Sequence, residues 1–208
     1  MFRIISIIVL LASVSAVILH FMITRSKPKQ TATAKPAKRP GLLGILDVLS
    51  KLAYLVGVLS FSALLITGFF PCLVLGQTIS GYWLMVHVSA GGIFAVCLAF
   101  MTVMFAEQCR FDRSDCSRLQ KLFGKESVER QDIIKFTSGL KISFWLIILL
   151  ALPVILSIIM SMLGIAGTHG QELLMQLHRY CALPLAVIAV INMYLVIKSA
   201  VKNNIKIV

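Results

Sequence analysis

Long apolar runs dominate the chain, and five of them are long enough to cross a membrane. A membrane-spanning helix needs about 20 mostly apolar residues. The runs that meet this length are Phe2–Thr24, Leu52–Leu75, Gly81–Ala106, Ile142–Ile165 and Leu173–Ile197. Because only helices and closed barrels satisfy their backbone groups in lipid, the pattern predicts an all-α membrane protein. We expect four helices in an up-down-up-down bundle, with one extra transmembrane helix at the N-terminus.

The polar connectors between these runs differ in length and charge. Residues Arg25–Pro40 are rich in Pro and Lys and contain no acid, which predicts a flexible linker. The connectors Gln77–Ser80 and Ala166–Glu172 are short, whereas Glu107–Lys141 is long, mixed in charge and expected to be partly helical. The chain thus divides into an N-terminal anchor (1–24), a basic linker (25–50) and a four-helix membrane domain (51–208).

The basic residues are distributed asymmetrically. Of the 20 Lys and Arg residues, 18 fall in or beside the linker, the long connector and the C-terminal tail. Arg3 and Arg179 are the other two. Since cytoplasmic loops of membrane proteins are enriched in Lys and Arg, this pattern predicts an outer N-terminus and a cytoplasmic C-terminus.

The first apolar run has a second interpretation. It begins with Arg3 and carries small residues at 13–16, as a cleaved secretory signal does. Cleavage would place the basic linker outside the membrane, against the charge rule, so a retained anchor is favoured.

Composition limits the classes of function. The chain is 59% hydrophobic and 13% charged, far from the roughly 25% charge of soluble domains. The net charge of +12 flanks the apolar runs, so lipid headgroups rather than nucleic acid are the expected partners. Cys109 and Cys116 lie in a polar connector, where two thiols are a weak indication of a metal site.

Two of the four histidines lie at matched positions in apolar runs. His87 lies 20 residues before Glu107 and His178 lies 20 residues before Lys198, and both runs have the same predicted direction. At 1.5 Å per residue, both rings lie about 30 Å from the cytoplasmic end, near the outer surface. His20 at a span end and His169 in a short outer connector need no such function.

Two imidazoles at one depth suit axial ligation of haem iron. Small residues one turn beyond each histidine, including Gly91 after His87, leave space for a macrocycle. Arg179 beside His178 is a candidate partner for a haem propionate or a residue that reaches the interface. The alternative is that both histidines are structural contacts between helices.

Several stretches from about Leu52 onward carry a resemblance to a known family. They are TGFFP (67–71), LMVHVSAGGIFAVCLAFM (84–101), FTSGLKISFW (136–145) and QLHRYCALPLAVIAVINMYL (176–195). In order and spacing they resemble the gamma subunit of respiratory formate dehydrogenases, a membrane cytochrome b related to the cytochrome b561-like proteins. The resemblance implies a four-helix fold, electron transfer from an iron–sulfur or cytochrome subunit on the outer side, and a quinone partner.

The resemblance also implies two b haems, but only one ligand pair is present. The outer pair corresponds to His87 and His178, whereas the inner histidine of the last helix is replaced by Asn192. Its expected partner near Ala53 is absent, and Thr137 and Leu140 replace the Asn and Gln usual near the quinone. We therefore expect one haem b, and quinone exchange near the outer haem.

The predicted function is that of an electron-transfer subunit of an oxidoreductase complex, without substrate chemistry of its own. Its axial ligands would be His87 and His178, with Arg179 and Gly91 completing the haem site. The alternative from another class is a non-haem membrane anchor or assembly subunit in which both histidines are structural.

Overall fold

The computed structural model describes residues 2–23, 42–111, 128–164 and 167–204. These ranges form an all-α protein without strands among the described residues. Its elements are α1 (Phe2–Ile23), α2 (Leu42–Phe70), the short π-helix η1 (Pro71–Leu75), α3 (Gly81–Phe105), α5 (Val128–Met162) and α6 (Thr168–Asn204). Five helices of the described chain are long and apolar enough to cross a membrane, as expected from the sequence.

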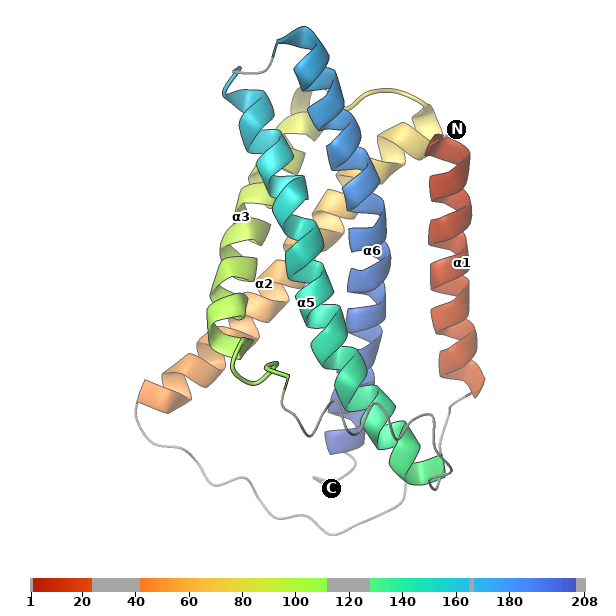
Figure 1. Ribbon diagram of the computed structural model, residues 1–208, viewed down its shortest axis with the longest axis vertical. Coiled ribbons are helices and arrows are strands. Elements are labelled where there is room, and N and C mark those ends of the chain that lie inside the picture. Colours follow the sequence, from red (N-terminus) through yellow and green to blue (C-terminus); the bar gives the residue numbers. More distant parts are fainter. Residues whose placement is uncertain (1, 24–41, 112–127, 165–166, 205–208) are drawn as a thin grey trace.

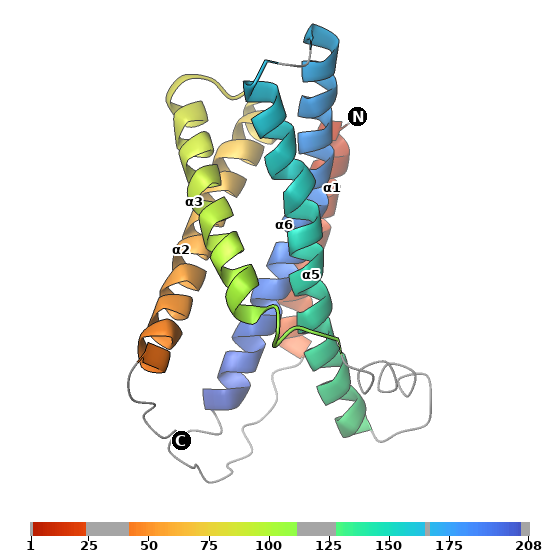
Figure 2. The same cartoon turned by 60° about the vertical axis from the view of Figure 1, so that its left-hand side comes forward.

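The helices form two hairpins and one added helix (Figures 1 and 2). Helix α2 pairs with α3, and α5 pairs with α6. Contacts between the two hairpins are sparse in the described residues, and most of them join α3 to α5. Helix α1 packs on the outside of this arrangement, against α6 and η1 (Figure 1). The multi-pass membrane fold predicted from the apolar pattern is therefore confirmed.

The helices extend beyond the predicted apolar runs. Helix α2 begins at Leu42 rather than Leu52, and α5 begins at Val128 rather than Ile142. Helix α6 runs from Thr168 to Asn204, past both ends of the predicted run 173–197. A helix continues into water wherever its residues favour it, whereas hydropathy marks only the apolar part. The longer α5 also accounts for the predicted partial helicity of the connector 107–141.

Two glycines shape the tight turn between α2 and α3. Gly76 ends η1 with φ of 68°, and Gly81 begins α3 with φ of 58°. A side chain is strained at such positive angles, so this short turn depends on glycine at both positions. The turn brings the end of α2 directly back against the start of α3.

Helix α1 is attached near both of its ends. The Arg3 guanidinium donates from Nε to the Leu73 carbonyl at 2.8 Å and from a terminal nitrogen to the Val74 carbonyl at 3.2 Å. At the other end, the His20 ring hydrogen-bonds the Tyr194 hydroxyl of α6. These contacts join α1 to η1 at one end and to α6 at the other.

The helix interfaces are built from small residues. The fully or nearly fully buried apolar residues of the described chain are Ala90, Ala151, Leu185 and Ala186. Buried Ser and Thr side chains accompany them, and several donate to a carbonyl one turn earlier, as Ser60 does to Val56. Such residues let membrane helices approach closely, and most of these hydroxyls are satisfied; Ser6 is buried without a hydrogen-bond partner among the described residues.

Candidate functional site

The rings of His87 and His178 face each other between the two hairpins. Their centroids lie 6.4 Å apart and their planes are inclined by 72°. His87 comes from α3 and His178 from α6, and both side chains are half-buried. Along their helices they lie about 9 Å from the start of α3 and about 15 Å from the start of α6, at 1.5 Å per residue. The two rings are close in space, as the sequence predicts, although their distances from the helix starts differ by about 6 Å.

His87 is held by α2. Its Nδ1 lies 2.8 Å from the Thr67 hydroxyl oxygen, and that hydroxyl lies 2.7 Å from the Ala63 carbonyl. A hydroxyl has one hydrogen to donate, and a carbonyl only accepts. Both bonds form together when Thr67 donates to Ala63 and accepts from His87 Nδ1–H. This arrangement leaves the lone pair of His87 on Nε2.

His178 is held in the same way by α5. Its Nδ1 lies 3.1 Å from the Val154 carbonyl oxygen and 3.4 Å from the Ser157 hydroxyl. The Ser157 hydroxyl itself donates to Val154 at 2.8 Å. Since a carbonyl can only accept, Nδ1 of His178 carries the hydrogen and Nε2 carries the lone pair. Neither Nε2 atom has a hydrogen-bond partner in the described part of the protein.

This geometry fits two axial ligands of one metal. Metal–imidazole bonds are about 2 Å long, so two rings on opposite sides of one ion have centroids about 6 Å apart. The observed 6.4 Å matches that separation. Imidazoles that ligate metals through one nitrogen usually donate from the other to a carbonyl or similar acceptor, as both rings do here. The ring separation and the two Nδ1 contacts are therefore compatible with one haem, the cofactor expected from the sequence, held by both rings.

A metal ion bound by protein side chains alone is not supported. No group of three or more His, Cys, Asp or Glu side chains that could hold a metal ion occurs among the described residues. Zinc requires about four ligands. A macrocycle that supplies four nitrogens needs only the two imidazoles. Two cysteines gave a weak indication of a metal site in the sequence. Cys109 belongs to no group of potential metal ligands among the described residues, and Cys116 lies outside the described residues.

Two of the residues around His87 were not identified from the sequence. An added Cβ at Gly68 would lie 3.0 Å from Cε1 of the His87 ring, so this glycine contacts the ring directly. Thr67 and Gly68 both belong to TGFFP, which was noted only for its resemblance. Gly91, the predicted haem-site glycine, lies against α2, where an added Cβ would be 3.8 Å from Leu64. Val154 holds His178 through its main-chain carbonyl, which no sequence pattern marks. Ser157, whose hydroxyl also lies near His178, was not predicted either.

Arg179 and His169 lie at the same end of the bundle as the histidine pair. Arg179 is exposed and lines a polar hollow with Ser161, Thr168, Gln171, Glu172, Met175 and Gln176. His169 is exposed near the start of α6. His20 lies at the opposite end of the molecule on the Tyr194 contact. Only His87 and His178 of the four histidines are brought together.

The end of the bundle that is distant from the histidine pair has a different polar pair, which includes Asn192. The Asn192 amide donates to the Ser143 hydroxyl at 2.8 Å, which joins α6 to α5. Nearby, the Trp145 indole donates to the Cys109 carbonyl at 3.0 Å. Burial raises the pKa of the Cys109 thiol, and the positive charge of Lys141 opposes this in part. No second facing pair of histidine rings occurs among the described residues.

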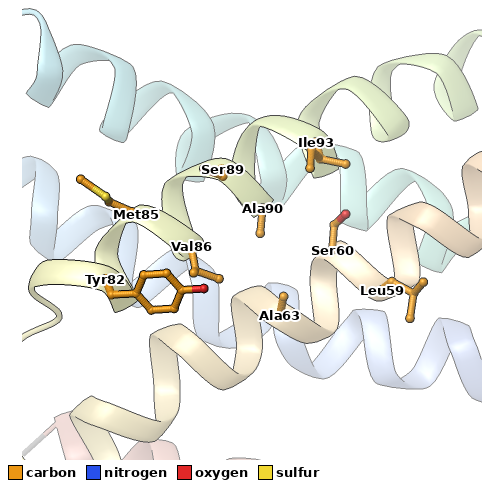
Figure 3. A pocket seen from close by; sticks show the side chains of 9 residues that line it. All are labelled: Leu59, Ser60, Ala63, Tyr82, Met85, Val86, Ser89, Ala90 and Ile93. Atoms are coloured by element: carbon orange, nitrogen blue, oxygen red, sulfur yellow. The ribbon is translucent and has the colours of Figure 1, made fainter.

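A groove lies along α2 and α3 (Figure 3). Its volume is about 490 Å³. The lining is mostly apolar, from Leu59, Ala63, Met85, Val86, Ala90 and Ile93. It also includes the hydroxyl-bearing residues Ser60, Tyr82 and Ser89. Because Tyr82 and Met85 are exposed, the groove opens on the outside of the bundle.

Comparison with protein-family models, curated proteins and solved structures gives no match to this chain.

Proposed function

We propose that the protein is a b-type haem subunit of a membrane oxidoreductase complex. It transfers electrons between a redox partner on the outer side, an iron–sulfur or cytochrome subunit of the formate dehydrogenase type, and membrane quinone in a bacterial respiratory chain. The protein performs no substrate chemistry of its own. It binds one haem b through His87 and His178.

The facing arrangement of the two imidazoles carries this proposal. A histidine that only joins two helices needs one hydrogen bond, which Thr67 and Val154 already provide. Such a role does not require the two rings to approach each other to 6.4 Å across the junction of the hairpins. Two neutral imidazoles at this separation, each with Nδ1 engaged, are what axial ligation requires.

The protein's own residues orient and tune the site. Haem supplies one-electron oxidation and reduction when it is bound. His87 and His178 would hold the haem through their Nε2 nitrogens, from α3 and α6, where contacts between the two hairpins are sparse. Arg179 adds a positive charge at the outer edge, which favours the reduced, less positive state of a nearby centre.

The distribution of charge supports the proposed orientation. Lys51, Lys141 and Lys198 lie in the halves of their helices that are distant from the histidine pair, and Arg110 lies beyond the distant end of α3. Under the positive-inside rule this end faces the cytoplasm, with the C-terminus. The histidine pair then lies toward the outer surface, where the partner subunit docks.

The groove on α2 and α3 is the position that we propose for the quinone ring. Quinones are apolar and diffuse in the bilayer, so they must enter from the lipid side. Ser60 donates its hydrogen to Val56 and keeps an acceptor oxygen, while Ser89 and Tyr82 have no hydrogen-bond partner in the described chain. Val86 lines the groove and precedes His87 directly, which keeps a bound ring close to the ligand helix.

A second function is supported by the same hydrogen bonds. The Thr67–His87 and Val154–His178 contacts each join the two helices of one hairpin. A non-haem anchor or assembly subunit with structural histidines would use these contacts and nothing more. Haem binding requires the Nε2 atoms of both histidines, whereas a structural role uses only their Nδ1 atoms.

Visible spectroscopy of the purified protein separates the two functions. We expect a reduced-minus-oxidised spectrum of b-type haem in the wild type and its loss in both His87→Ala and His178→Ala. His169→Ala, an exposed histidine on the same side, is the matched control and keeps the spectrum. A wild type purified from haem-sufficient cells without this spectrum, or two alanine variants that retain it, would refute the haem function.

A further inference from the structure

Two consecutive residues of α2 contact the His87 ring in different ways. Thr67 accepts a hydrogen bond from Nδ1, at 2.8 Å. Gly68 lies under the ring edge, where an added Cβ would be 3.0 Å from Cε1 and 3.6 Å from Nδ1. The hydrogen bond fixes which nitrogen carries the proton, and the glycine fixes how close the ring lies to α2. We call Thr67 and Gly68 the His87 support.

The Thr67 hydroxyl is itself fixed. The Thr67 residue is 3% exposed, and its hydroxyl donates its one hydrogen to the Ala63 carbonyl of α2 at 2.7 Å. Its oxygen therefore faces His87 only as an acceptor. An acceptor on Nδ1–H increases the electron density at Nε2 and the basicity of the imidazole as a ligand.

The two histidines differ in what supports them. His178 donates to the main-chain carbonyl of Val154, which no side-chain substitution removes. His87 depends on the Thr67 side chain. The strength of the His87 ligand can therefore be changed by one side chain, whereas that of His178 is set by the backbone of α5.

We propose that Thr67 and Gly68 are positioning residues of the haem site. Thr67 holds His87 in the Nδ1–H tautomer and raises its strength as an electron donor, and Gly68 sets the position of its ring. This inference rests on the proposed haem function, although the tautomer is a property of the protein alone. Because a stronger donor favours oxidised iron, Thr67 lowers the midpoint potential of the haem.

Removing the hydroxyl tests this role. Thr67→Val keeps the branched shape and removes the acceptor. We expect haem affinity to fall about 10- to 100-fold, the usual cost of losing a hydrogen bond behind a metal ligand, and the midpoint potential to rise. Thr67→Ser restores the acceptor, since a helical serine makes the same bond to the preceding turn, as Ser60 does. It should return affinity and potential close to wild type.

Thr102→Val is the matched control. Thr102 lies in α3 and donates to the Leu98 carbonyl at 2.7 Å, as Thr67 donates to Ala63, and it has no hydrogen bond to a histidine. It should leave affinity and potential unchanged. Gly68→Ala keeps the hydroxyl and pushes the ring, so it should weaken haem binding and alter the electron paramagnetic resonance signal, which depends on ring orientation.

A measurement on the haem-free protein separates failure of this inference from failure of the proposed function. In protein labelled with ¹⁵N-histidine, we expect the Nδ1–H tautomer of His87 in wild type, Thr67→Ser and Thr102→Val, but not exclusively in Thr67→Val. If the wild type binds haem and Thr67→Val matches it in affinity, potential and tautomer, the inference alone is overturned. If the wild type binds no haem, the proposed function fails and the haem role of Thr67 fails with it, whatever the tautomer.

Discussion

At the scale of residues, the sequence predicted the histidine pair but not its support. Matched distances to the next charge placed His87 and His178 at one depth, and helix geometry converts that count into a position. Thr67 and Val154 were not predicted because their contacts depend on which faces of neighbouring helices meet. That depends on packing between segments far apart in the chain, which one sequence does not record.

Arg179 is expected to raise the potential of the haem. Replacing it with Gln removes one positive charge next to a ligand residue. The oxidised haem then becomes more stable relative to the reduced haem, and the midpoint potential falls. The fall should be small and decrease with added salt, because the guanidinium is exposed and screened by water and ions. Redox titration at low and high ionic strength measures it. Arg179→Lys, which keeps the charge, should change the potential less, and a rise in the Gln variant would contradict this role.

At the scale of elements, helix existence was predictable and helix length was not. The five apolar runs became five helices, because a run of about 20 apolar residues has few other stable structures in a membrane. The ends of α2, α5 and α6 extend beyond the predicted spans because polar residues also form helix outside the bilayer. The pairing of helices into two hairpins followed from the short connectors, whereas the docking of α1 on α6 and η1 did not.

Arg3 is expected to stabilise the docking of α1. It donates hydrogen bonds to the Leu73 and Val74 carbonyls at the end of η1. Arg3→Gln should lower the free energy of unfolding by about 1 kcal/mol. A buried hydrogen bond to a charged group contributes somewhat more than about 1 kcal/mol, and the value is lower here because Arg3 is exposed. Denaturation in detergent micelles measures the change. Arg179→Gln is the control, as an exposed arginine at the same end, and an equal loss in that variant would show that the effect is not specific to α1.

Filling the groove on α2 and α3 should slow electron exchange with quinone. Ser89→Leu places a large side chain at the lining position that lies between Tyr82 and Ile93 (Figure 3). We expect at least about a tenfold loss in the rate of haem oxidation by a water-insoluble quinone, which corresponds to about 1.4 kcal/mol of lost binding. The haem spectrum should not change. Ser62→Leu, at an exposed serine of α2 outside the groove, is the matched control.

The quinone position has a definite contrary outcome. If Ser89→Leu has no effect and substitutions at the inner end, such as Asn192→Leu or Lys141→Gln, slow the exchange, the quinone binds at the cytoplasmic side. That result would restore the arrangement that the family resemblance implies, despite the loss of the inner histidines.

At the scale of the whole molecule, the chain is a membrane bundle with one facing pair of histidines in its described part. Apolar length determined the fold class, and two histidine positions determined the candidate site. Asn192, the position at which the expected resemblance calls for a second ligand, bonds Ser143 instead. We therefore predict one haem per chain, near the outer surface, and no electron relay across the inner half of the membrane.

Electron paramagnetic resonance of the oxidised, purified protein, together with its haem content, reports both the number of haems and the residues that ligate them. We predict one haem b per chain with a low-spin signal typical of two imidazole ligands, and loss of that signal in both His87→Ala and His178→Ala. A high-spin or single-histidine signal in the wild type, or two haems per chain, would contradict the ligand pair on which the account depends.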